Sequence, residues 1–302
     1  MNSAGTTLNS GNAGAFSVTS AVTGTGNLIL KANSNGVIGL SAVNNVGTIT
    51  NSGTSTGAVT ISGVIGTNVT GVIQNSATSS LILSGTNTYT GATLITAGTL
   101  KLDATGTINN SSEVSLGTVG TFDVTAKSLG YTVATLKGSG NVTGALTVST
   151  QLAIGNSPGT TNFSSSLTLG AGSTYLYDLT GGVVPGLADL GDIAGALTIT
   201  AGAILDLVQL GTYTANNKFT LFAYDGALTG TFKDTSSNNL ADGATFTDAG
   251  GSWMIDYNDT SAGANGGVSA SNTYVTITAI PEPNVAALLG GLGVVALLRR
   301  RR

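Results

Sequence analysis

Residues 80–102 read SLILSGTNTYTGATLITAGTLKL, and their pattern is the most informative in the chain about its fold. Two alternating runs, SLILSG from Ser80 and GTLKLDA from Gly98, flank a Thr-rich segment. Alternation over four to six residues between turn-forming residues predicts β-strands. If these strands stack in parallel, we expect five leucines to point into one shared core: Leu81, Leu83, Leu94, Leu100 and Leu102.

Similar runs recur along the first half of the chain: NLILKA from Asn27, GAVTISG from Gly57, SEVSLG from Ser112, ALTVST from Ala145 and SLTLGAG from Ser166. No stretch of comparable length has helical spacing, so the body is predicted to be all-β. A sandwich or barrel built from hairpins is one possible architecture, and a parallel β-solenoid is the other. Small residues, stackable Thr and Asn, and few aromatic residues favour the solenoid, a right-handed parallel β-helix.

The composition excludes several classes of function. The 302 residues include no Cys and no His, and only 8% are charged, with a formal net charge of -4. Catalysis by His or Cys, zinc fingers and disulfide frameworks are therefore excluded. All four arginines stand at the C terminus, at 299–302, so the body has few groups that could neutralise phosphates. We expect no nucleic-acid binding, no enzymatic activity and no cofactor.

The composition also divides the chain. Residues 1–174 form the predicted solenoid repeat region, and 175–279 form an acidic segment with more aromatic residues. That second segment holds 11 of the 16 aromatic residues and 10 of the 12 aspartates. Larger side chains imply a thicker core, so we interpret 175–279 as the last rungs and a cap that closes the solenoid. A sugar-binding platform of Tyr, Trp and Asp is the alternative.

Residues 280–302 form a third unit. Pro281, Glu282 and Pro283 interrupt the strand pattern, 285–298 carries no charge, and Arg299, Arg300, Arg301 and Arg302 end the chain. A helix of 14 residues would reach about 21 Å, short of the roughly 30 Å hydrocarbon core of a bilayer. We predict a short transmembrane-like helix that is a weak anchor. Because basic residues stay on the cytoplasmic side, the arginines stop the segment there and the body lies outside the cytoplasm.

This order of Pro-Glu-Pro, apolar run and arginine cluster resembles the PEP-CTERM sorting signal of exported bacterial proteins. The resemblance implies recognition of Pro281, Glu282 and Pro283 by a membrane protease-transferase, the exosortase. It also implies transient insertion of 285–298 into the inner membrane, then cleavage near Pro281–Pro283 and a final place at the cell surface or outside the cell. Residues 1–25 contain neither Lys nor Arg and no apolar run, so either an export leader is missing from this sequence or the start of the gene is misplaced.

The body has a second resemblance. Ser84–Gly91, which reads SGTNTYTG, followed by Thr93–Ile95 and Ala97–Leu102, resembles the autotransporter-associated β-strand repeat. One copy is clear and the others are degenerate. The resemblance implies a β-helical stalk or passenger at the cell surface.

The aspartates are the remaining candidates for chemistry. They are Asp189 with Asp192, Asp178, and Asp256 with Asp259. Glycosidases need two facing carboxylates, and Asp256, Asn258 and Asp259 offer the oxygen ligands that calcium takes. Aspartates in such segments more often hydrogen-bond their own turns, which is the interpretation that we favour.

Together these patterns predict a non-enzymatic, exported bacterial surface or extracellular matrix protein with a structural or adhesive role. The alternative is a carbohydrate-active or glycan-binding β-helix protein that acts on exopolysaccharide.

Overall fold

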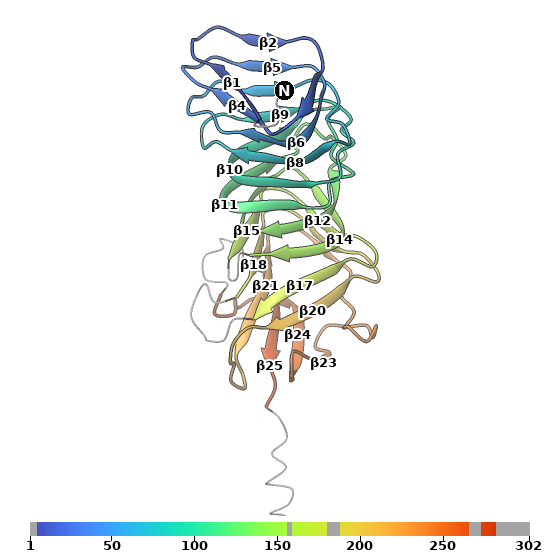
Figure 1. Cartoon of the computed structure of the whole chain (residues 1–302). Helices are drawn as coiled ribbons and strands as arrows, with labels where there is room; N and C mark the ends of the chain where they lie inside the picture. Colours follow the sequence, from blue (N-terminus) through green and yellow to red (C-terminus); the bar gives the residue numbers. More distant parts are fainter. Residues whose placement is uncertain (1–4, 156–158, 180–187, 266–272, 282–302) are drawn as a thin grey trace, which may run out of the picture.

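The computed structural model describes residues 5–155, 159–179, 188–265 and 273–281. Within these ranges every regular element is a strand, and most neighbouring strands pair in parallel. The strands lie in layers along one long axis, from the N-terminal strands at one end to the C-terminal strands at the other (Figure 1). The prediction of an all-β chain of stacked parallel strands is confirmed.

Parallel ladders form three faces of the stack. The first face contains β1 (Thr6–Ser10), β4 (Leu28–Ala32), β8 (Val69–Asn75), β17 (Thr174–Leu179) and β20 (Ile204–Gln209). The second contains β2 (Phe16–Val18), β5 (Ile38–Leu40), β7 (Val59–Ile61), β9 (Leu81–Leu83), β13 (Gly140–Thr143), β15 (Thr160–Phe163), β18 (Leu190–Ile193) and β21 (Lys218–Tyr224). The third contains β3 (Val22–Thr25), β16 (Leu167–Leu169), β19 (Leu197–Ile199) and β22 (Leu228–Thr229).

Five longer strands turn a corner and belong to two faces. Those shared by the first and second faces are β10 (Ala92–Leu102) and β11 (Val114–Asp123). Those shared by the first and third faces are β6 (Val43–Asn51), β12 (Tyr131–Gly138) and β14 (Leu146–Ile154). A chain that passes from face to face in this way builds a solenoid, in which each coil contacts only its neighbours.

The core is a column of inward side chains that repeats from rung to rung. On the second face Val59 pairs with Leu81, Leu81 with Leu100, and Leu100 with Phe122, and each is 0% exposed. The runs SLILSG and GTLKLDA therefore pair in parallel, as expected. Leu83 and Leu102 are likewise fully buried.

The prediction that Leu94 points into the core is wrong. Thr93 and Ile95 are 0% exposed, whereas Leu94 between them is only partly buried on the outer surface. The inward positions are odd-numbered up to Ile95 and even-numbered from Leu100. The chain turns a corner between them, where Gly98 has a φ of +68° and the register shifts. That corner reverses the alternation of inward and outward side chains. Leu94 therefore points outward, although Leu100, six residues later, points inward.

The C-terminal end is built differently. β21 pairs antiparallel with β25 (Thr273–Ala279), β25 with β24 (Gly251–Asp259), and β24 with β23 (Thr245–Asp248). Trp253 is fully buried here and its ring centroid lies 4.5 Å from that of Tyr213. The antiparallel pairing ends the second ladder, because β25 occupies an edge of β21 that a further parallel rung would use.

Segment 285–298 and the predicted helix lie outside the described residues. Among those that the structure describes, no helix is long and apolar enough to cross a membrane.

Candidate functional site

A groove runs along the outer side of the first face. Leu94, Ser115, Lys137 and Ala153 occupy successive rungs in register there. Glycines at 117, 138 and 155 leave space beside this row, because they carry no side chain. The groove has a volume of about 430 Å³, and at its far end lie Asp178 and Asp189.

The carboxyl of Asp189 occupies a corner between the first and second faces. The Asp178 backbone N–H donates to its Oδ2 at 3.2 Å. Its Oδ1 lies where a side chain at residue 155 would be, since a Cβ built on Gly155 would stand 1.8 Å from that oxygen. Gly155 also has a φ of +92°, so both space and backbone demand glycine here. Asp189 is 1% exposed, and its Oδ1 has no hydrogen-bond partner among the described residues.

These surroundings change the ionisation of Asp189. Burial, with a smaller contribution from the nearby charge of Asp178, raises the pKa of its carboxyl to about 7. Backbone N–H groups of Asp178 and Gly159 act in the opposite direction. The carboxyl is thus close to half protonated at neutral pH.

Lys137 is the basic group of the groove lining, and it has its own partner. Its Nζ lies 2.8 Å from a carboxylate oxygen of Glu113 on the preceding rung. The positive charge is therefore balanced by Glu113.

Asp192 does not join Asp189 in one site. It lies on β18 in the outer row of the second face, where Asn141, Asn162 and Asp192 follow one another in register. Asn162 Nδ2 donates to Asn141 Oδ1 at 3.2 Å. Asp192 lines a separate groove of about 420 Å³ together with Asp225. The structure brings Asp178 to Asp189 and places Asp192 apart from them.

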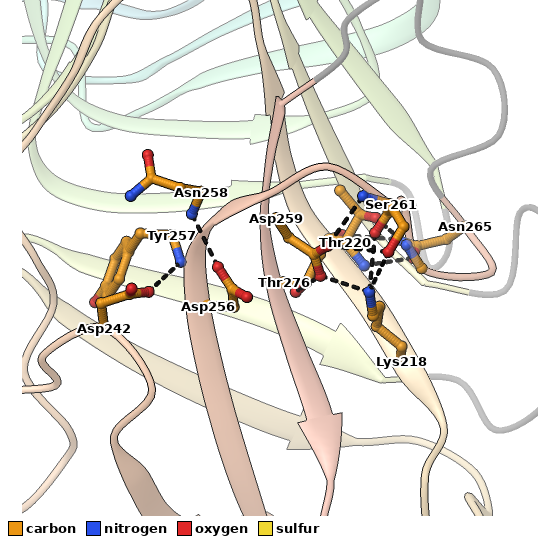
Figure 2. A network of polar contacts seen from close by, with 11 residues as sticks. Lys218, Thr220, Asp242, Asp256, Tyr257, Asn258, Asp259, Ser261, Asn265 and Thr276 are labelled. Atoms are coloured by element: carbon orange, nitrogen blue, oxygen red, sulfur yellow. Dashed lines mark hydrogen bonds and ion pairs between the residues drawn. The ribbon is translucent and has the colours of Figure 1, made fainter.

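Asp259 is held in an ion-pair network near the C-terminal end (Figure 2). Its Oδ2 accepts hydrogen bonds from Lys218 Nζ at 2.5 Å and Thr276 Oγ1 at 2.8 Å, and its Oδ1 accepts one from Ser261 N at 2.9 Å. Burial acts to raise the pKa of Asp259, but Lys218 and the hydrogen bonds prevail and lower it to about 2. This carboxylate is already neutralised by protein groups.

Asp256 lies apart from this network. Its Oδ1 accepts the backbone N–H of Asn258 at 3.0 Å, which is a local turn contact, and Figure 2 shows it separated from Asp259. The register of β24 also shifts between the two aspartates. Within the part of the chain that the structure describes, no group of three or more acidic, His or Cys side chains is placed to hold a metal ion.

Asn265 is a residue that the sequence did not single out. Its Nδ2 donates to the backbone oxygens of Thr220 at 2.7 Å and Asp189 at 2.9 Å, and to Tyr177 Oη at 3.0 Å. Its Oδ1 accepts Thr220 N at 2.7 Å. This buried amide ties the C-terminal strands to the Asp189 corner. No local pattern could reveal it, because its partners lie between 45 and 88 residues away.

The predicted sorting residues fall mostly beyond the described chain. Pro281 is exposed, directly after Ile280, whose N–H donates to Ser252 O at 2.8 Å. Glu282, Pro283 and the arginines at 299–302 lie outside the described residues.

Comparison with known families matches the passenger-associated-transport-repeat to residues 78–102. No curated protein and no solved structure matches the chain. The match coincides with β9, β10 and the loop between them, which make one coil whose ends pair at Leu81 and Leu100. The predicted autotransporter-associated repeat is confirmed at this place. Its presence indicates a passenger-like protein exported to the cell surface.

Proposed function

We propose that this chain is a non-enzymatic bacterial surface or extracellular matrix protein with a structural or adhesive role. The observation that carries the proposal is the repeat at 78–102, which forms one coil of a continuous stack. Such a stack is a rod in which each coil contacts only its neighbours. A right-handed coil is part of the proposal, because parallel strand connections are almost always right-handed.

The proposed route to the surface uses the C-terminal segment. An exosortase-type protease recognises Pro281, Glu282 and Pro283 while 285–298 lies in the inner membrane and Arg299–Arg302 stay cytoplasmic. The support is the charge placement in the sequence: the arginines follow the apolar run. Pro281 is exposed at the end of the described chain, which suits access by a protease.

The test is expression, with a leader added, in a host that has the exosortase. We expect the protein outside the cell, without the arginine tail by mass spectrometry. Replacing Arg299–Arg302 with Ser, or Glu282→Ala, leaves it uncleaved or mislocalised, whereas Lys31→Ser, which removes an exposed base from the body, has no effect. Recovery of the intact Arg-terminated chain from the medium would refute the sorting proposal.

A carbohydrate-active or glycan-binding protein that acts on exopolysaccharide is the second candidate. The observation in its favour is the pair Asp178 and Asp189 at one end of the first-face groove. A general acid must reach the glycosidic oxygen, however, and Asp189 is only 1% exposed. We expect no reducing or unsaturated ends after incubation with a panel of bacterial exopolysaccharides. Product formation that is lost in Asp189→Ala or Asp256→Ala would establish the second candidate instead.

A further inference from the structure

The Asp189 corner has a buried charge that the protein does not balance. Buried side-chain oxygens without a hydrogen-bond partner occur at three described residues, Asn45, Ser139 and Asp189, and Asp189 is the only acid among them. An ionised carboxylate in this position is unfavourable unless a proton or a cation compensates it. Other aspartates already have such compensation: Asp259 has Lys218, and Asp234 accepts three hydrogen bonds from Ser236 and Asn238.

Asp189 Oδ1 is buried without a hydrogen-bond partner in the space beside Gly155, and Asp189 is part of the groove lining there. Gly155 directly follows β14, and the Asp189 oxygen takes the place of its side chain. Extending the pairing of Leu152 with Tyr175 by three residues places Asp178 beside Gly155 on the next rung. Two carboxyl groups therefore meet at one end of the groove, and the groove's lysine is paired with Glu113.

We propose that Asp178 and Asp189 bind a divalent cation, Ca²⁺, at this end of the first-face groove. Carboxylate oxygens are the ligands that this hard ion takes, and Ca²⁺ accepts irregular geometry that Mg²⁺ does not. Two carboxylates supply only part of its coordination, so backbone carbonyls and water supply the rest. That ligand set corresponds to the weak end of protein calcium sites, with a Kd on the order of 0.1–1 mM.

Calcium would have a structural effect at this corner. Asp189 is joined through Asn265 to Thr220 and to Tyr177, so a cation that neutralises its carboxyl stabilises the junction between the coils and the C-terminal strands. The inference is independent of how the protein is exported.

The experiment uses the full chain, stripped with EDTA and dialysed to pH 8. CaCl₂ is then titrated across the millimolar range by calorimetry, with thermal unfolding followed in parallel and NaCl of equal ionic strength as the salt control. We expect one binding event per chain and a rise of roughly 2–4 °C in the unfolding midpoint at ten times the Kd.

Two variants and one control make the test specific. Asp189→Asn keeps the shape of the side chain and loses the charge, so its affinity for Ca²⁺ falls by roughly tenfold or more. Asp178→Asn, in a less buried position, gives the same loss should Asp189→Asn fail to fold. Asp192→Asn, on the strand that directly follows Asp189 but in the other groove, binds Ca²⁺ as the unmodified chain does. Absence of a calcium-specific shift, or an equal shift in all variants, overturns the proposal.

Discussion

At the scale of single residues, Asp189 makes stability depend on pH. The pKa of its carboxyl is about 7 in the folded chain, against about 3.9 in an unfolded one. Between these values the unfolded chain releases the proton that the folded chain keeps. The free energy of unfolding therefore falls as pH rises from 4 to 7, by up to about 1.4 kcal/mol per pH unit.

We predict that Asp189→Asn removes this fall. In EDTA, urea unfolding of the unmodified chain should give a lower free energy of unfolding at pH 7.5 than at pH 5, two values that lie roughly on either side of the carboxyl's titration. In the variant, the free energy of unfolding should change less between these two pH values. Asp259 does not interfere with this comparison. Because its pKa is lowered to about 2, the stability that it contributes is lost only as pH falls below about 3.9, the ordinary pKa of an aspartate. Parallel profiles for both chains would show that Asp189 is not the group responsible.

At the scale of elements, β10 shows where the alternation of apolar residues predicts which side chains point into the core and where it does not. The inward set Leu81, Leu83, Leu100 and Leu102 could be predicted because each pair lies within a run whose alternation no corner interrupts. Leu94 could not, since the corner at Gly98 reverses the phase and nothing in the local pattern of apolar residues marks it. A buried hydroxyl adds to the difficulty: Thr93 Oγ1 lies 2.7 Å from Tyr89 Oη inside the core.

The same limit applies to the candidate site. The aspartates could be selected from the sequence by type, but their grouping depends on which face each strand occupies. Asp189 and Asp192 are three residues apart and line different grooves, whereas Asp178 and Asp189 meet across a corner. The antiparallel C-terminal strands and Asn265 depend on contacts across long sequence separations, which a local pattern does not encode.

We predict that Ile95→Ala and Leu94→Ala lower the free energy of unfolding by different amounts, although the two residues are neighbours. Ile95 is 0% exposed, so its truncation leaves a cavity and lowers the free energy of unfolding by about 2–5 kcal/mol. Leu94 lies at the groove surface, so its truncation costs less than about 1 kcal/mol. Urea unfolding of both variants measures the difference, and equal losses would contradict the phase reversal in β10.

At the scale of the whole molecule, the coils differ in length but continue the same ladders. Between β7 and β9 the offset is 22 residues, since Val59 pairs with Leu81. The next coil, from Leu81 to Leu100, has an offset of 19 residues, and the coil from Leu100 to Phe122 has 22 again. From Phe163 to Ile193 the offset is 30 residues, so later coils carry longer loops. The ladders continue through both kinds of coil, which indicates that stability is a sum over coils and the interfaces between them.

Duplicating one coil tests that conclusion. A second copy of residues 62–83, inserted between Leu83 and Ser84, repeats the register because Ile61 and Leu83 occupy the same ladder position. We expect the same ellipticity per residue, one cooperative unfolding transition, and a rod longer by about 4.8 Å in small-angle scattering. The buried amides at this level keep their partners: Asn51 still donates to Gln74 of the first copy, at 2.8 Å in the parent chain.

Duplicating only residues 62–72 is the control, because half a coil places the following strands on the wrong face and exposes the core residues that they carry. Loss of structure with the full coil, or equal tolerance of both insertions, would show that the coils do not behave as repeated units.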